Sequence, residues 1–305
     1  KSIFSKNIVN TFNIPDELKE TSKIFTRSLN YPMEEIIEHF NGHKFITKDT
    51  KIISIGSCFS QSISDWLLKK GYSCQSNIWG VVYNPQSVSQ IIDYSVNTPI
   101  GLRLNNFGNN DRYYDPYRKS SDHSEPVDLG NSEYQAEENL KQHYQNSRDA
   151  FKDSNLLLFN LDLTESGGTE RIKSLLRNPR PQIFTTNNHE FHVLSYEEVY
   201  NSVKNSIMTL RQINPEIAIL LNVEPIPLSI SYQCDLGPFV ANQFAKSVLH
   251  AVAIRITQEI EYSFYLPLYE ISRCNPSKIY SDDGRHISTQ GISLFMKAFE
   301  ELYVI

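Results

Sequence analysis

Three residues, one near the start of the chain and two near its end, are of the types that together perform acyl transfer. Ser57 follows a short β-branched run, and Asp283 precedes His286 by three residues. A carboxylate can orient an imidazole through one ring nitrogen while the other nitrogen takes the proton of a serine hydroxyl. The sequence therefore predicts Ser57 as a nucleophile, His286 as its base and Asp283 as the orienting carboxylate.

Each of these residues also has a simpler structural interpretation. Serine is a favoured N-cap, so Ser57 can merely begin a helix, and a lone histidine at the surface is more often a polar loop residue. Asp282 competes with Asp283 for the orienting role. Cys58 is a second candidate nucleophile, although a cysteine at this place on a helix is more often buried and inert. The serine and the Asp-His pair together favour catalysis.

Residues so distant in sequence can meet at one edge of a sheet, and the hydrophobic pattern predicts such a sheet. Short apolar runs alternate with helical stripes, which is typical of right-handed βαβ crossovers. We expect an α/β fold, a three-layer α/β/α sandwich around a central five-stranded parallel sheet, with the active crevice at the carboxyl ends of its strands. The predicted strands are Lys51–Ile55, Tyr72–Cys74, Asn155–Leu161, Ile217–Val223 and Phe264–Leu268.

The helical stripes place Ser57 at a turn between the first strand and a helix. The first N–H groups of a helix are unpaired and carry partial positive charge, so a hydroxyl at this position lies near a suitable site for an oxyanion. Five longer helices are predicted: Phe59–Gly71, one from Ser87 onward, one that begins at a Ser195–Glu198 capping signature, about Phe239–Glu261, and one that begins after Ser288. A short helix is expected near Pro32–Phe40.

The chain is predicted to hold one catalytic domain with an extension. Residues 1–50 are expected to form an N-terminal extension packed on the main domain, which spans residues 51–305. Residues 97–150 are rich in Asn, Asp, Ser and Tyr with little periodicity, which predicts a long loop. Such loops inside compact domains are functional or disordered, so this one is a candidate lid, and its Tyr113 and Tyr117 could stack on sugar rings.

Composition narrows the range of partners. The 305 residues are 40% hydrophobic, enough for one large core. A net charge of -6 without a basic stripe makes nucleic acid an unexpected partner. The sequence has no apolar run of the ~18 residues that a membrane span requires. Four cysteines without a Cys-x-x-Cys pair favour reduced thiols. No charged and then apolar leader follows Lys1, so a signal peptide is either absent or was removed, and we expect a cytoplasmic protein.

Cofactor and metal signatures are absent from the sequence. It contains no Gly-x-Gly-x-x-Gly or Walker-type loop, which disfavours a tightly bound nucleotide. His189 and His192 are three residues apart and lack a His-Glu-x-x-His frame, so they make a poor zinc site. We therefore expect no metal and no tightly bound cofactor.

Gly56-Ser57-Cys58-Phe59-Ser60 is similar to the Gly-Ser-Cys-Phe-Ala signature that names the GSCFA family. This family is a branch of the SGNH (GDSL-like) hydrolase superfamily, so the resemblance implies a flavodoxin-like fold. The other similar segments follow in the family's order from about Lys51 to Ile305. They are Tyr83–Ser87, Asp122-His123-Ser124, Asn187-Asn188-His189, Val223–Pro227, Tyr265–Glu270 and Asp283–His286.

The resemblance implies roles beyond those of Ser57, Asp283 and His286. The backbone N–H groups of Ser57 and Gly80 and the hydroxyl of Thr164 would form the oxyanion hole, although Gly80 can equally be an ordinary turn glycine. The resemblance also implies substrate-binding positions, although Asn84 can instead hold an Asn-Pro turn and His189 can be structural. These positions are Asn84, His123, Glu165 and His189.

Two departures from the family pattern lie at strand ends. Asp162 takes the place of a glycine, which would put a carboxylate near the oxyanion hole and could slow hydrolysis or alter the substrate. Glu224 takes the place of a serine, which we interpret as a milder change.

The resemblance implies a serine-dependent esterase or O-acyltransferase that forms an acyl-Ser57 intermediate. Its substrates would be esters on carbohydrate, such as O-acetyl groups of a bacterial surface polysaccharide, with acetyl-CoA as a possible acyl donor. Exclusion of water would decide between hydrolysis and transfer. The alternative is a glycan-binding module without turnover on a degenerate hydrolase fold, which Asp162 motivates. The sequence does not determine the oligomeric state.

Overall fold

The computed structural model describes residues 33–38, 40–76, 78–97, 113–119, 126–168, 190–231, 233 and 235–305. The described chain divides into two compact units. One unit is Ile46–Leu268, and the other joins the described residues before Ile46 to Tyr269–Ile305. The predicted extension at residues 1–50 stays a prediction, and residues 1–32 lie outside the described part.

The unit Ile46–Leu268 is built on a five-stranded sheet in which all paired neighbours are parallel. The strand order is β2-β1-β5-β8-β9. Ile52 pairs with Cys74 on one side and with Leu156 on the other, and Leu156 pairs in turn with Ala218. These pairings confirm the predicted fold class. The strands are β1 Ile52–Ile55, β2 Cys74–Ser76, β5 Leu156–Leu161, β8 Ala218–Val223 and β9 Ser263–Tyr265.

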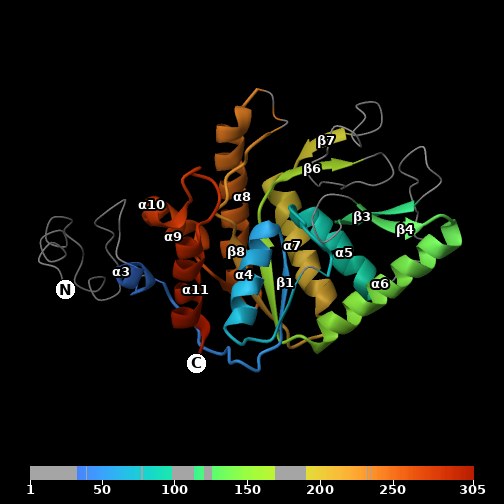
Figure 1. Cartoon of the computed structure of the whole chain (residues 1–305), viewed down its shortest axis with the longest axis horizontal. Coiled ribbons are helices and arrows are strands. Elements are labelled where there is room, and N and C mark those ends of the chain that lie inside the picture. Colours follow the sequence, from blue (N-terminus) through green and yellow to red (C-terminus); the bar gives the residue numbers. More distant parts are fainter. Residues whose placement is uncertain are drawn as a thin grey trace, which may run out of the picture. The chain divides into compact units, whose positions relative to one another are not determined.

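Helices cover both faces of this sheet. Helix α4 packs on β1 and β2, whereas α5 packs on α6 and α7, and α7 packs on α8. Parallel crossovers are right-handed, so the reversal of strand order at β1 puts α4 on one face and the layer from α5 to α8 on the other (Figure 1). The bounds are α4 Cys58–Lys69, α5 Pro85–Asn97, α6 Glu133–Asp153, α7 Tyr196–Leu210 and α8 Gly237–Glu259.

Burial and capping explain why these segments form where they do. Every residue of β5 and of β8 is buried, as expected for strands covered on both faces. Helix α7 begins at a capping box, in which Ser195 accepts from the Glu198 N–H and the Glu198 carboxylate accepts from the Ser195 N–H. The capping signature that the sequence predicts for this helix is therefore confirmed.

Residues 97–150 differ from the long loop predicted for them. They contain a hairpin of β3 (Tyr113–Lys119) and β4 (Pro126–Gly130), followed by most of α6. The helix was missed because its buried face includes polar side chains such as His143 and Ser147. Its start is signalled in the sequence, since Ser132 caps it by accepting from the Gln135 N–H at 3.2 Å. A lid role for this segment stays a prediction.

A second hairpin follows the carboxyl end of β5. It pairs β6 (Glu165–Gly168) with β7 (Glu190–Val193) in antiparallel register. Residues 169–189, which include the predicted site residue His189, lie outside the described part.

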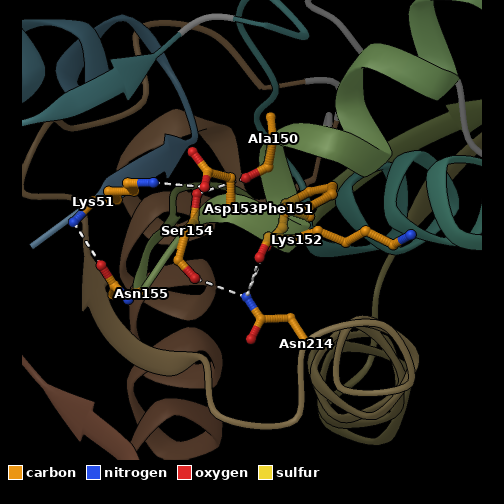
Figure 2. A network of polar contacts seen from close by, with 8 residues as sticks. All are labelled: Lys51, Ala150, Phe151, Lys152, Asp153, Ser154, Asn155 and Asn214. Atoms are coloured by element: carbon orange, nitrogen blue, oxygen red, sulfur yellow. Dashed lines mark hydrogen bonds and ion pairs between the residues drawn. The ribbon is translucent and has the colours of Figure 1, made fainter.

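Hydrogen bonds connect the segments at the amino ends of the strands, opposite the edge formed by their carboxyl ends. The Asn214 amide donates to the carbonyls of Phe151 (2.8 Å) and Ser154 (2.7 Å), as Figure 2 shows. The Lys51 N–H donates to the Asn155 side chain at 2.9 Å. These bonds join the start of β1, the start of β5 and the turn before β8, so the strands enter the sheet in a fixed register.

The second unit is helical. Helix α11 (Thr289–Tyr303) packs on α10 (Pro276–Ile279) and on α3 (Met33–Glu38). Ser288 caps α11 by accepting from the Gly291 N–H at 2.9 Å, as the sequence predicts. Helix α9 (Leu268–Cys274) leads into this unit from β9.

Candidate active site

The carboxyl ends of three neighbouring strands bring Ser57, Asp162 and Glu224 to one edge of the sheet. Strand β1 lies beside β5, and β5 lies beside β8. Gly56-Ser57 follows β1, Asp162 follows β5 and Glu224 follows β8. The strand order reverses at β1, and crevices at such switch points are the usual ligand sites of open α/β sheets. The edge is therefore the candidate active site.

Ser57 is the N-cap of α4, and its hydroxyl has two partners. Its Oγ accepts a hydrogen bond from the Phe59 N–H at 3.1 Å and donates to Glu224 Oε2. The Ser57 N–H donates to Glu224 Oε1 at 3.1 Å. The residue is 1% exposed. The capping interpretation is correct, but the contact with a buried carboxylate gives Ser57 a second role that capping alone does not explain.

Glycine is required at position 56 because the chain passes close to two other strands. A Cβ on Gly56 would lie 2.5 Å from Asn160 Cβ and 3.1 Å from Glu224 Oε1. Real Cβ atoms do not approach other carbons so closely. Gly56 therefore permits the close approach that holds Ser57 against Glu224.

Buried amides lie beneath the serine turn. Asn160 Nδ2 donates to the Ile55 carbonyl at 3.0 Å and to Ser54 Oγ at 3.3 Å. Asn222 Nδ2 donates to Asn160 Oδ1 at 2.6 Å. Connected buried hydrogen bonds of this kind rigidify a site. They fix the end of β1 relative to β5 and β8, and with it the turn that carries Ser57.

A buried ion pair lies beside this network. Lys246, in the middle of α8, is fully buried and donates to Asp162 Oδ1 and to the Asp162 carbonyl, both at 2.9 Å. Asp162 was expected to place its charge near the oxyanion hole. Lys246 neutralises that charge, and the carboxylate that contacts the serine belongs to Glu224.

The Glu224 side chain is fully buried, and this environment disfavours its charged form. Burial raises the pKa of Glu224 to about 8, and the negative charge of Asp162 adds to the rise. The hydrogen bonds from Ser57 and the charge of Lys246 act in the opposite direction. Glu224 is therefore far more readily protonated than an ordinary glutamate.

Two of the expected oxyanion donors lie on segments that join this edge. The Val82 N–H donates to the Gly56 carbonyl at 2.8 Å, which ties the loop carrying Gly80 to the serine turn. Gly80 has φ +68°, a conformation that favours glycine. Thr164 Oγ1 is fully buried, and no hydrogen-bond partner for it exists among the described residues. A buried hydroxyl without a partner can donate to a ligand, and the oxyanion role of Thr164 stays a prediction.

The expected substrate-binding residues have structural partners or lie outside the described part. Asn84 is buried, and its Oδ1 accepts from the Ser87 N–H at 2.9 Å at the start of α5, the contact that the structural interpretation predicts. Glu165 Oε1 accepts from Ser231 Oγ and from Gln233 Nε2. His123, like His189, lies outside the described residues.

The Asp283–His286 pair forms in the helical unit. Asp283 Oδ2 lies 2.5 Å from His286 Nδ1, and Asp283 Oδ1 accepts from the N–H groups of Arg285 and His286, both at 3.0 Å. These hydrogen bonds, the one from the His286 side chain first, lower the pKa of Asp283 to about 2. Asp283, and not Asp282, is therefore the carboxylate that holds the imidazole.

A neighbouring arginine also contacts this imidazole. Arg285 Nη1 lies 3.3 Å from His286 Nε2, and a guanidinium can only donate. A neutral His286 that carries its ring proton on Nδ1, facing Asp283, is the tautomer that a general base requires, and the contacts of both ring nitrogens are compatible with it. Because Ser57 belongs to the other compact unit, its meeting with His286 stays a prediction.

Glu224 and Lys246 are the site residues that the sequence analysis undervalued or missed. Glu224 was noted at a strand end but interpreted as a mild change, whereas it contacts the serine directly. Lys246 carries a signal in the sequence, because it lies on the buried face of α8 next to Ala245 and Leu249. An ionisable side chain on such a face requires a buried partner.

Other predictions have mixed outcomes. Cys58 is exposed, so the expectation that it is buried is wrong. In the part of the chain that the structure describes, no three His, Cys, Asp or Glu side chains gather as a metal site would require, and the expected absence of metal stays a prediction. None of the helices among the described residues has the length and apolar character that crossing a membrane requires.

The sheet order and the serine at the switch point define a flavodoxin-like α/β protein with a candidate nucleophile after its first core strand. The chain belongs to the GSCFA family, whose model matches residues 51–299. The family predicted from the sequence motifs is thus confirmed. No curated protein matches the chain.

Solved structures with a similar chain path include three esterases or lipases. A GDSL-like lipase from Bacteroides thetaiotaomicron VPI-5482 is 10% identical, with a TM-score of 0.41 over 85% of this chain and 90% of that chain. A Clostridium thermocellum family 3 carbohydrate esterase is 10% identical, with a TM-score of 0.37 over 83% and 94%. A family two carbohydrate esterase from Clostridium thermocellum, in complex with cellohexaose, is 14% identical, with a TM-score of 0.31 over 83% and 62%.

Proposed function

We propose that the chain is a serine-dependent esterase or O-acyltransferase that acts on esters of carbohydrate. The observation that carries the proposal is the position of Ser57, which caps a helix at the switch point of a parallel sheet. The contact between Asp283 and His286 Nδ1, which orients the imidazole, supports it. The carbohydrate class and the O-acetyl group extend the proposal from the resemblance to the GSCFA family, and a cytoplasmic location extends it from the cysteine pattern.

The proposed reaction has two acyl-transfer steps. His286 Nε2 takes the Ser57 proton as Oγ attacks the ester carbonyl, and the N–H groups of Ser57 and Gly80 and the Thr164 hydroxyl stabilise the oxyanion. The bond to the leaving alcohol breaks, and His286 returns the proton to its oxygen. Water or a sugar hydroxyl then gives its proton to His286 and attacks the acyl-Ser57 ester. When that ester bond breaks, Ser57 Oγ regains the proton.

Short-chain nitrophenyl esters test the nucleophile and the base. We expect Ser57→Ala to remove hydrolysis and labelling by a fluorophosphonate probe, and His286→Ala to lower kcat at least 100-fold. Ser62→Ala, an exposed serine on the same helix, and His192→Ala, an exposed histidine, are the matched controls. If Ser57→Ala and wild type hydrolyse the ester equally and neither is labelled, the proposal is wrong.

A second experiment separates transfer from hydrolysis. Wild type is incubated with acetyl-CoA and a polysaccharide acceptor, and the acetyl content of the acceptor is measured. An acceptor that gains acetyl groups supports transfer, whereas an unmodified acceptor together with nitrophenyl ester cleavage supports an esterase.

The contact between Ser57 and Glu224 favours one alternative function. Glu224 accepts hydrogen bonds from both the hydroxyl and the N–H of Ser57, and the side chain of Ser57 is buried. A glycan-binding module without turnover would tolerate this arrangement permanently. Binding of an acetylated polysaccharide by wild type and by Ser57→Ala with equal affinity, without ester cleavage by either protein, would establish this alternative.

A further inference from the structure

Glu224 contacts both groups of Ser57 that the proposed reaction uses. Its Oε2 accepts from the Ser57 hydroxyl, and its Oε1 accepts from the Ser57 N–H at 3.1 Å. The first group must give its proton to a base, and the second must donate to the oxyanion. A carboxylate that accepts from both therefore competes with the base and with the substrate.

The charges around Glu224 leave it without a counter-ion of its own. The charged groups of the described residues that act on it are Asp162, at the end of β5, and Lys246, in α8. Lys246 directs both of its hydrogen bonds in the described structure to Asp162. The Asp162–Lys246 pair is neutral as a whole. An ionised Glu224 would thus be an uncompensated charge in a fully buried position, which is strongly unfavourable.

We propose that Ser57 reacts only while Glu224 is protonated, so that Glu224 is a catalytic residue that sets the alkaline limit of activity. This inference rests on the proposed function of Ser57. An ionised Glu224 holds the Ser57 proton away from His286 and puts a negative charge beside the developing oxyanion. Both effects raise the barrier to attack.

Protonation reverses one hydrogen bond and weakens the other. A neutral Glu224 can donate its own O–H to Ser57 Oγ, which then accepts from Glu224 and Phe59 and can turn its proton to His286. The other oxygen of the neutral Glu224 is a weaker acceptor than a carboxylate oxygen, so the Ser57 N–H is more readily available to donate to the oxyanion. The Glu224 proton stays on Glu224 throughout, and the Ser57 proton alone passes to His286 and the leaving group.

The expected pH dependence follows from the state of Glu224 in the free enzyme. Its pKa is raised to about 8, so the reactive neutral form predominates below this pH and is lost above it. The neutral fraction falls about tenfold between pH 7 and pH 9, since each unit above the pKa costs a factor of ten. The value of kcat/KM, which reports the free enzyme, should fall by the same factor.

The test compares pH profiles of kcat/KM for a nitrophenyl ester, corrected for spontaneous hydrolysis. We expect the wild-type value to be about tenfold lower at pH 9 than at pH 7. Glu224→Gln has nearly the same shape and cannot ionise, so its ratio between these pH values should be close to one. Glu197→Gln, an exposed glutamate on α7, is the matched control and should keep the wild-type ratio.

Two outcomes would overturn the inference. One is a Glu224→Gln variant with the same tenfold alkaline fall as wild type. The other is a wild-type kcat/KM that stays constant or rises through pH 8, and a rise that Glu224→Gln abolishes would make Glu224 a base. Absence of ester cleavage and of fluorophosphonate labelling at every pH would instead refute the proposed function.

A measurement on wild type alone covers the case in which Glu224→Gln does not fold. Carbon-13 NMR of the full chain labelled at glutamate carboxyl groups should show one group that titrates near pH 8. If every glutamate carboxyl is ionised by pH 6, Glu224 carries its charge at neutral pH and the inference fails, whatever the activity. A group that titrates near pH 8 supports it even if no substrate has been found.

Discussion

Replacing Lys246 by methionine should destabilise the fold strongly, because it removes the counter-ion of a buried carboxylate. Lys246 is fully buried, and its ammonium lies 2.9 Å from Asp162 Oδ1. Methionine fills much of the space of the lysine stem but leaves Asp162 without its partner. Breaking a buried pair in this way costs about 3–5 kcal/mol. We therefore expect Lys246→Met to lower the free energy of unfolding by that amount.

Urea denaturation of the full chain at pH 7, followed by tryptophan fluorescence, measures the loss. Trp79 is a suitable probe because it is buried and stacks on Phe151 with ring centroids 4.7 Å apart. Lys141→Met is the control: this lysine lies on the surface of α6, 2.9 Å from Glu138, and exposed pairs of this kind contribute little. Its denaturation midpoint should stay near that of wild type.

The double variant Asp162→Asn, Lys246→Met separates the loss of a counter-ion from a simple packing defect. It removes both charges, so we expect it to be about 2 kcal/mol more stable than Lys246→Met alone. The reasoning is refuted if Lys246→Met denatures at the same urea concentration as the surface control. It is also refuted if the double variant is less stable than the single one, since the two charges would then act independently.

Three further predictions concern the site. Asp283→Asn should lower kcat for a nitrophenyl ester at least 100-fold because it disfavours the His286 tautomer that serves as a base, and a loss below threefold would contradict this role. Thr164→Val should lower kcat ~100-fold through loss of an oxyanion donor. It should leave the urea denaturation midpoint equal or higher, because the hydroxyl that it removes has no partner among the described residues. Activity equal to that of wild type would exclude the donor role. Gly56→Ala should cost about 1–3 kcal/mol in urea denaturation, because its Cβ would meet Asn160 Cβ at 2.5 Å, and an unchanged midpoint would mean that the turn can relax.

The elements that the sequence predicts well are those whose signal is local. Strand β5, Leu156–Leu161, and β8, Ala218–Val223, are continuous apolar runs and are buried throughout, and both were predicted within one residue of their ends. The start of α7 was predicted from its capping box. In these segments the burial pattern and the cap are both readable within a few residues, so no knowledge of the rest of the chain is needed.

Helix α6 shows why other elements were missed. Its buried face mixes Leu140 and Tyr144 with His143 and Ser147, and the rest of its surface is charged or polar. Hydrophobic periodicity is therefore weak, although Tyr144 packs in a small cluster with Leu129 and Leu140. Leu129 of that cluster belongs to β4. The helix is therefore stabilised by contact with another element, and the sequence pattern of α6 alone does not reveal that contact.

The candidate site was predictable in its residue types but not in its contacts. The sequence shows that Ser57, Asp162 and Glu224 each follow a strand. The hydrogen bond between Ser57 and Glu224 joins residues 167 positions apart, and it depends on β1, β5 and β8 being neighbours in that order. Strand order is a property of the assembled sheet, so the mild interpretation of Glu224 was natural from the sequence alone.

The two departures from the family pattern at these strand ends have different physical consequences. Asp162 is matched by the ammonium of Lys246, so the fold contains both charges as a neutral pair. Glu224 has no such match, and its hydrogen bonds go to the residue proposed to react. A carboxyl group in that position is best accommodated without its charge, and a neutral carboxyl leaves the serine able to attack. A glutamate in place of the family's serine at this strand end is therefore compatible with catalysis as long as the glutamate keeps its proton.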